Sequence, residues 1–178
     1  QHAKEHGLHC DLGPGDRLFY YTTCGWMMWN WLVSALAVDS AIVLYDGSPF
    51  EPDPERLLDL VDDERISVFG TSPKYLATLE SAGVKPRLSH DLGSLKTLLC
   101  TGSALSPQSY DYVYRDLKTD LCLASMSGGT DIISCFVNGN PWLPVRRGEI
   151  QGKSLGMAVE VWNDAGQAVV GEKGELVC

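Results

Sequence analysis

The sequence predicts an α/β protein, with a mainly parallel sheet flanked by helices and a small β-hairpin-rich extension at the C-terminal end. Three observations indicate this class. From about residue 16 to residue 135, short and nearly continuous apolar runs alternate with helical patterns, as in sheets covered on both faces. A hydroxyl or an acid followed by proline opens a helix three times, each time after a strand. Beyond residue 135 the helical patterns stop and turn-rich, strand-like segments follow.

The expected strands are short runs rich in aliphatic, aromatic and β-branched residues. They cover residues 17–23, 40–45, 67–71, 94–102 and 120–125. Because parallel strands need a crossover between them, a helix is expected in most of the intervening segments.

The expected helices show apolar residues on one face, as Leu57, Leu58 and Val61 do among acids. They cover residues 26–38, 54–66, 73–81 and 107–117. A capping side chain and a proline in the first turn begin the last three, at Asp53–Pro54, Ser72–Pro73 and Ser106–Pro107.

The C-terminal part has the pattern of β-structure. Residues 157–162 and 167–170 are predicted to form a hairpin around an Asn-Asp-Ala-Gly turn, and residues 174–178 a further strand. We therefore expect an α/β core at about residues 16–135 and a β-rich extension at about residues 136–178. The chain of 178 residues starts without methionine and ends in a strand pattern, so residues 1–178 are expected to be one piece of a larger domain.

The composition excludes several classes of partner. The chain has a formal net charge of −9, and a field of this sign repels nucleic acid and anionic membranes. No apolar segment has the length of a membrane span, and the polar N-terminal residues lack the apolar region of a signal peptide. We expect a cytoplasmic protein with reduced cysteines, because the six cysteines form no C-x-x-C pair. The four histidines show no zinc-ligand spacing, so a zinc site is not expected.

Small polar residues follow four of the predicted strands. They lie in residues 45–49, 70–73, 100–107 and 124–131. Ligands bind outside the carboxyl ends of the strands in open parallel sheets, so all four segments are candidates. Helix capping by Ser-Pro explains the first two without a ligand, and the third fits capping and ligand binding equally well. The fourth caps no predicted helix and is the strongest candidate.

That fourth segment contains Gly128 and Gly129 followed by a hydroxyl and a carboxylate. Thr130 can donate to a phosphate oxygen, and Asp131 can help to hold a hard cation such as Mg²⁺. Neither G-x-x-x-x-G-K-[ST] nor G-x-G-x-x-G occurs in the chain, so a simple flexible turn stays open as the alternative.

Residues 24–32 contain three tryptophans and two methionines. A buried core helix is the first interpretation of this apolar load. Methionine and tryptophan at the start of a helix could also form the adaptable wall of a ligand pocket. If the tryptophans were exposed, they would instead indicate a structural or interaction domain.

Five segments carry a resemblance over essentially the whole chain: DLGPGDRLFYYTTCGWMMWNWLVSALA, IVLYDGSPFEPD, LKTLLCTGSALSP, SMSGGTDI and GMAVEVWNDAGQAVVGEKGELVC. With these segments in this order, the chain resembles the adenylate-forming acyl-CoA synthetases. Such enzymes convert a carboxylate and ATP into an acyl-adenylate and pyrophosphate, and the thiol of CoA then displaces AMP. The resemblance implies an acid–thiol ligase with ATP/AMP, Mg²⁺ and CoA as its ligands.

The resemblance also implies roles for individual residues. Thr130 would contact the α-phosphate, and Asp131 would replace the glutamate that the family associates with Mg²⁺, which makes both catalytic candidates. The implied adenine contacts are Gly102, Ser103 and Ala104 on one side, and Ser125, Met126, Ser127, Gly128 and Gly129 on the other. The chain departs from the family at two of these contacts: Ser103 replaces an acid, and Ser127 replaces an aromatic residue.

Relatives that activate acetate have a tryptophan where Gly128 stands. Glycine would leave room for a longer acid such as acetoacetate, with Trp26, Met27, Met28 and Thr101 as the neighbouring wall. Another short-chain 3-oxo or 3-hydroxy acid is the alternative within the family.

The resemblance implies partners in the rest of a longer chain. In the family, a Ser/Thr/Gly-rich phosphate loop lies upstream of the matched region, and a mobile C-terminal lid domain with a catalytic lysine lies downstream. We expect the isolated 178 residues to be inactive, because stabilisation of the phosphoryl centre depends on those groups. A non-catalytic nucleotide-binding module of the same fold is the alternative.

Overall fold

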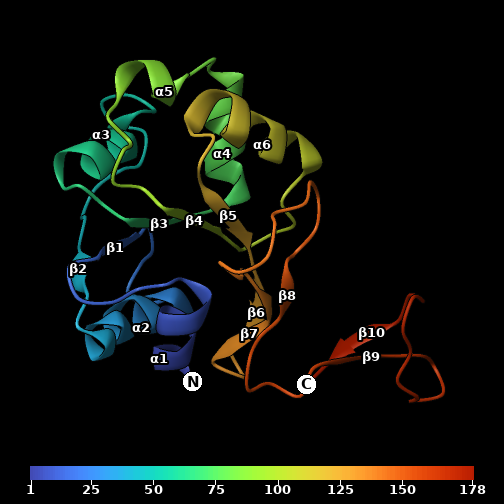
Figure 1. Cartoon of the computed structure of the whole chain (residues 1–178). Coiled ribbons are helices and arrows are strands. Elements are labelled where there is room, and N and C mark those ends of the chain that lie inside the picture. The colour runs from blue at the N-terminus through green and yellow to red at the C-terminus, as the bar shows by residue number, and fades with distance from the viewer.

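A five-stranded parallel sheet in the order β2-β1-β3-β4-β5 forms the centre of the molecule, in a computed structural model that describes all residues 1–178 (Figure 1). The strands are β1 (Arg17–Tyr20), β2 (Ala41–Val43), β3 (Val68–Thr71), β4 (Thr97–Cys100) and β5 (Cys122–Ser125). Every neighbouring pair in this sheet is parallel. The predicted fold class is thereby confirmed.

Helices cover both faces of the sheet (Figure 1). One face carries α3 (Arg56–Asp63), α4 (Pro73–Ser81), α5 (Pro86–Ser89) and α6 (Pro107–Tyr112), which continues as the π-helical turn η3 (Val113–Leu117). The other face carries α1 (His2–Lys4), η1 (Glu5–His9), α2 (Met27–Ser34) and the 3₁₀ turn η2 (Ala35–Val38).

The core is divided between these two faces because side chains alternate along each strand. In β1, Phe19 packs into a cluster of 20 buried residues on the side of α3, α4 and α6. Leu18 and Tyr20 point the other way, into a cluster of 13 that includes residues of α2. The Phe19 and Phe69 rings stack in the larger cluster, with their centroids 5.5 Å apart.

The predicted helix starts have two outcomes. Ser72 and Ser106 cap their helices as expected, since each hydroxyl accepts a hydrogen bond from a backbone N–H three residues on. Asp53 does not cap α3, because its carboxylate accepts from the Glu55 N–H at 2.8 Å and closes a turn first. The helix therefore begins at Arg56 instead of Pro54, and it ends at Asp63 because Arg65 has a left-handed backbone with φ of 51°.

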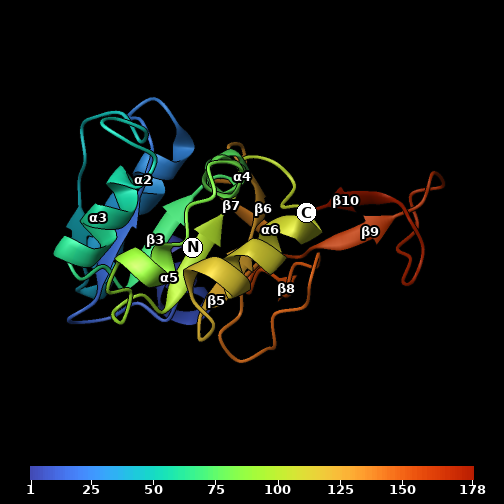
Figure 2. The same cartoon turned by 90° about the horizontal axis from the view of Figure 1, so that it is seen from above.

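The chain after β5 builds two small antiparallel sheets. One contains β6 (Ser127–Gly129), β7 (Ser134–Asn138) and β8 (Gly152–Lys153), and the other β9 (Glu160–Trp162) and β10 (Glu175–Val177). The β9–β10 pair projects from the body of the molecule (Figure 2).

The hairpin predicted for residues 157–170 forms only in part. Its turn is present, since the Gly166 N–H donates to the Asn163 carbonyl at 2.9 Å. The second arm contributes a single bridge between Trp162 and Ala168, and the strand that pairs with β9 is β10. No helix in the structure has both the length and the apolar character needed to cross a membrane.

Candidate functional site

A pocket of about 470 Å³ lies at the carboxyl ends of β4 and β5 and beside the first turn of α2. This is the edge at which open parallel sheets bind their ligands. The lining residues are Trp26, Met27, Met28, Thr101, Gly102, Ser103, Ala104, Ser125, Met126, Ser127, Gly128, Gly129, Thr130, Cys135 and Ile150.

The structure brings together three segments that the sequence analysis singled out separately. The start of α2, the loop after β4 and the segment from Ser125 to Thr130 share one cavity. Residues 45–49 and 70–73 do not line it. The capping interpretation is confirmed for Ser72, which caps α4, but it is wrong for Ser48, because the next helix begins only at Arg56. Cys135 and Ile150 were not anticipated, because they come from β7 and from the following loop, where no sequence motif marks them.

Two hydrogen bonds, one from a side chain and one between backbone groups, fix the loops that follow β4 and β5 relative to each other. The Thr101 hydroxyl donates to the Met126 carbonyl at 2.9 Å, and the Met126 N–H donates to the Cys100 carbonyl at 2.9 Å. Gly102 has φ of 102°, a conformation that residues with a side chain rarely adopt. These constraints hold the Gly102–Ala104 and Ser125–Ser127 backbones on neighbouring walls.

Gly128 is required by a close approach of two strands. It lies opposite Cys135 in the β6–β7 pair, next to a register shift. A Cβ atom at this position would overlap the Ser134 carbonyl oxygen and lie 3.1 Å from the Cys135 Cα. A side chain at residue 128 would therefore have to displace the β7 backbone.

The tryptophan-rich segment contributes to both core and pocket. Trp31 is buried in the smaller cluster, and Trp29 packs against that cluster. Trp26, which is 39% exposed, borders the pocket together with Met27 and Met28. The tryptophans thus form no continuous exposed patch, which argues against the interaction-domain interpretation.

Thr130 and Asp131 lie at the rim, where both are exposed. Thr130 is part of the lining, whereas Asp131 is not. The chain contains no group of three or more histidine, cysteine or acidic side chains that could hold a metal. A lone carboxylate at a rim nevertheless fits Mg²⁺, which is usually bound through one or two carboxylates while substrate phosphates and waters supply the other ligands.

The pocket lining contains no charged side chain. Its one thiol, that of Cys135, has its pKa raised by burial to about 12, so it stays protonated and acts as a small apolar wall residue. The Tyr110 hydroxyl, close to the pocket, donates to the Glu149 carbonyl at 2.8 Å, and burial raises its pKa. The arrangement can bind and orient a ligand, but it offers neither an acid–base pair nor a cation for a phosphate.

Comparison with known proteins identifies the class to which this fold and pocket belong. The family model described as "AMP-binding enzyme" matches residues 2–178, so the chain belongs to that family. Among curated relatives, an acetoacetyl-coenzyme A synthetase of Rhizobium meliloti (strain 1021) is 60% identical over the entire chain, and an acetoacetyl-CoA synthetase of Gallus gallus is 56% identical.

A solved structure supports the same assignment. The acetoacetyl-CoA synthetase from Streptomyces lividans superimposes with a TM-score of 0.93 at 44% identity, over 98% of this chain and 28% of that one. The chain spans 27% of the length of each of the two curated relatives.

Proposed function

We propose that residues 1–178 are one piece of the adenylation domain of an ATP-dependent acid–thiol ligase. The ligase would activate acetoacetate as its acyl-adenylate and transfer it to CoA, giving acetoacetyl-CoA, AMP and pyrophosphate. One observation carries the proposal: an uncharged pocket at the carboxyl ends of β4 and β5, in a chain that is 60% identical to an acetoacetyl-CoA synthetase over all its residues.

The nucleotide would lie between the two hydrogen-bonded loops. Gly102, Ser103 and Ala104 would contact one side of the adenine, and the segment from Ser125 to Gly129 the other. The Thr101–Met126 hydrogen bond supports this arrangement, because it fixes the spacing of the two walls. With serine at positions 103 and 127, adenine recognition would rely on backbone groups and packing.

The phosphates would extend toward the rim at Thr130 and Asp131. The Thr130 hydroxyl would donate to an α-phosphate oxygen, and the Asp131 carboxylate would help to hold Mg²⁺. When bound, Mg²⁺ neutralises phosphate charge, so that an anionic carboxylate can approach the α-phosphorus. The exposure of both residues supports these roles, because a hydrated ion and a triphosphate need access from solvent.

The acyl group would lie against the start of α2. Trp26, Met27 and Met28 would form one wall, and Thr101 and the Gly128 backbone the other. Apolar side chains suit the methyl end of a short acid, and a lining without charge would exclude water from the reacting carboxylate.

Other parts of the longer protein would supply the positive charge that this pocket lacks. A phosphate loop upstream and a lid domain with a catalytic lysine downstream are the proposed partners, and CoA would reach the adenylate from that side. We therefore expect no ATP–pyrophosphate exchange by the isolated chain. We also propose a cytoplasmic location, since all six cysteines are unpaired and a reducing compartment keeps thiols in that state.

The full-length protein tests this proposal by ATP–pyrophosphate exchange and acyl-CoA formation over acetate, acetoacetate, 3-hydroxybutyrate and butyrate. Acetoacetate is expected to have the highest kcat/KM. A higher kcat/KM for another acid would support the proposed ligase reaction but assign it a different substrate. AMP binding without exchange for any acid would favour the non-catalytic nucleotide-binding module.

Asp131→Asn in the same protein tests the metal role. We expect pyrophosphate exchange to fall by roughly a hundredfold, while CoA transfer from supplied acyl-adenylate falls much less, because the second half-reaction no longer involves the triphosphate. Asp164→Asn, an exposed carboxylate in the 163–166 turn, is the matched control and is expected to leave both steps unchanged. Equal losses in both steps for Asp131→Asn would contradict the assigned role.

A further inference from the structure

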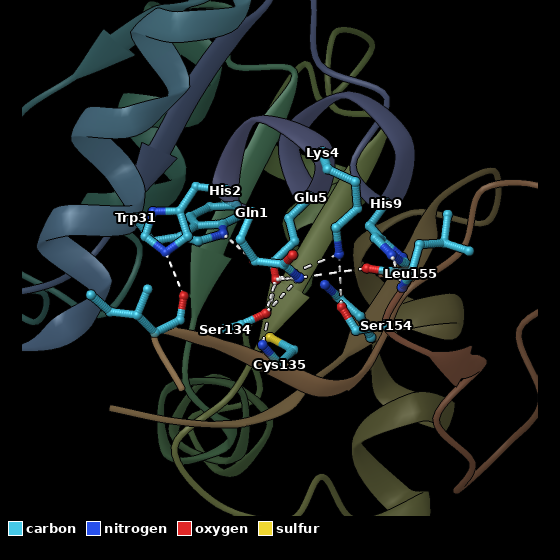
Figure 3. A network of polar contacts seen from close by, with 12 residues as sticks. Gln1, His2, Lys4, Glu5, His9, Trp31, Ser134, Cys135, Ser154 and Leu155 are labelled. Atoms are coloured by element: carbon cyan, nitrogen blue, oxygen red, sulfur yellow. Dashed lines mark hydrogen bonds and ion pairs between the residues drawn. The ribbon is translucent and has the colours of Figure 1, made fainter. Parts of the chain in front are cut away.

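The N-terminal residues form a buried polar network that the proposed chemistry does not use (Figure 3). Glu5, in η1, is fully buried, and its carboxylate lies between Trp31 of α2 and Ser134 of β7. A buried carboxylate is costly unless it is paired and hydrogen-bonded, so its surroundings indicate what it does.

Both oxygens of this carboxylate face donors. Oε2 accepts from the Trp31 indole N–H at 2.9 Å. Oε1 accepts a hydrogen bond from the Ser134 hydroxyl, and a second one from the Cys135 backbone N–H at 3.5 Å. Gln1 also donates to Oε1, at 3.3 Å, and the Lys4 ammonium lies 3.9 Å away.

These donors demand a carboxylate at this position. A glutamine amide has one accepting oxygen and one donating nitrogen, whereas Glu5 accepts on both sides. Whichever way a glutamine were turned, its NH₂ group would face a donor. The Ser134 hydroxyl could reverse its role, but the Trp31 and Cys135 N–H groups could not.

The donors belong to the two walls of the acyl end of the pocket. Trp31 lies one turn beyond Met27 and Met28 on α2, and both methionines line the cavity. Cys135 lines the cavity directly, and it pairs with Gly128 in the β6–β7 strands. Glu5 does not line the pocket, yet its hydrogen bonds join one wall to the other.

We propose that Glu5 is a positioning residue that sets the separation between α2 and the β6–β7 pair, and thereby the width of the acyl end of the pocket. The inference rests on the proposed function for its substrate, and it adds a specificity determinant outside the pocket. Loss of the shared carboxylate would let the walls move apart, so longer acids would gain relative to acetoacetate.

The test is Glu5→Gln in the full-length protein, with kcat/KM measured for acetoacetate and for 3-oxohexanoate. The ratio of the two values is the readout, because a reduced folded fraction lowers both equally and leaves the ratio unchanged. We expect the ratio to shift by about tenfold toward the longer acid, a size typical of one or a few methylene groups.

Asp116→Asn provides the matched control. Asp116 is another buried carboxylate, in η3, and its partner is Arg115 at 2.7 Å, with no link to the pocket. We expect this variant to lose stability while its substrate ratio stays within about twofold of the wild type. If Glu5→Gln fails to fold, Trp31→Phe and Ser134→Ala, which each remove one donor, must shift the ratio in the same direction.

Two outcomes would overturn the proposal. One is an unchanged ratio in Glu5→Gln, or in both single-donor variants. The other is unchanged amide hydrogen exchange in α2 and β7, because a lost link between the walls must increase local opening there. This second measurement needs no activity, so it still tests the role of Glu5 if the wild type activates no acid and the proposed function itself fails.

Discussion

The two faces of the parallel sheet are stabilised in different ways. The face under α3, α4 and α6 packs 20 buried hydrophobic residues. The opposite face packs 13, beside a buried carboxylate and two buried imidazoles with their hydrogen bonds. Three residues of this smaller cluster, Met28, Met126 and Cys135, line the pocket, whereas no member of the larger cluster is part of its lining.

The difference between the two faces indicates that one contributes mainly to stability and the other to the geometry of the pocket. Apolar packing tolerates many arrangements of similar volume, whereas a network of donors and acceptors is satisfied in very few. The face under α3, α4 and α6 is stabilised mainly by apolar burial, and its buried carboxylate, Asp116, pairs with the neighbouring Arg115. The face that supports the pocket includes polar groups whose directions fix where α2 and β7 lie.

The largest expected effect concerns the apolar face. Phe69→Ala removes a ring that is fully buried and stacked on Phe19, so the free energy of unfolding should fall by about 3–5 kcal/mol. Thermal or denaturant unfolding of the full-length protein measures this loss. The ratio of kcat/KM between acids of different length should stay constant, and a changed ratio would show that the apolar face also sets pocket geometry.

The second prediction concerns pH and the polar face. Burial lowers the pKa of His6 to about 4, although the Trp31 carbonyl partly opposes this shift. The folded state therefore keeps His6 neutral while the unfolded state takes up a proton below its ordinary pKa of 6.5. The stabilisation is complete above pH 6.5 and is lost as pH falls toward about 4, and it amounts to about 3 kcal/mol.

His6→Gln isolates this contribution, because the glutamine amide can still donate to the Trp31 carbonyl as the His6 Nε2 does at 2.9 Å. The difference in unfolding free energy between wild type and variant should shrink as pH falls through this window. A difference that stays constant with pH would contradict a neutral buried imidazole.

The third prediction compares two adjacent glycines. Gly128→Ala forces a methyl group against the β7 backbone, so we expect a loss of about 1–3 kcal/mol and a lower kcat/KM for acetoacetate. Gly129→Ala is the matched control, since its methyl group would meet only Ile132 and Phe136 at 3.8 Å, and it should change stability by no more than about 0.5 kcal/mol. Equal effects at both positions would show that the close approach at Gly128 is unimportant.

The α/β core could be predicted because its signals are local. Alternating apolar runs and Ser-Pro capping act within a few residues, and Ser72 and Ser106 cap their helices as the sequence indicates. The predicted start of α3 at Asp53–Pro54 was wrong, because a carboxylate can close a turn as readily as it caps a helix. The segments that form the pocket walls could be predicted from the rule that parallel sheets bind ligands at the carboxyl ends of their strands.

The polar network could not be predicted because it depends on distant partners. Glu5 and Ser134 are separated by 129 residues, and nothing near either one marks it as buried. The N-terminal segment is polar in sequence, although Glu5, His6 and His9 are all buried in the structure. The β6 strand escaped prediction for a different reason, since Ser127–Gly129 has almost no intrinsic β-propensity and pairs only because β7 lies beside it.

The uncharged lining of the pocket has a consequence for how enzymes of the AMP-binding family can diversify. Under the proposed function, this segment would set which acid fits, while the cations that drive phosphoryl chemistry would come from elsewhere in the protein. Recombination that exchanged residues 1–178 between two relatives would then transfer acid preference and leave the reaction itself intact. A chimera built in this way would inherit its substrate from one parent and its catalytic machinery from the other.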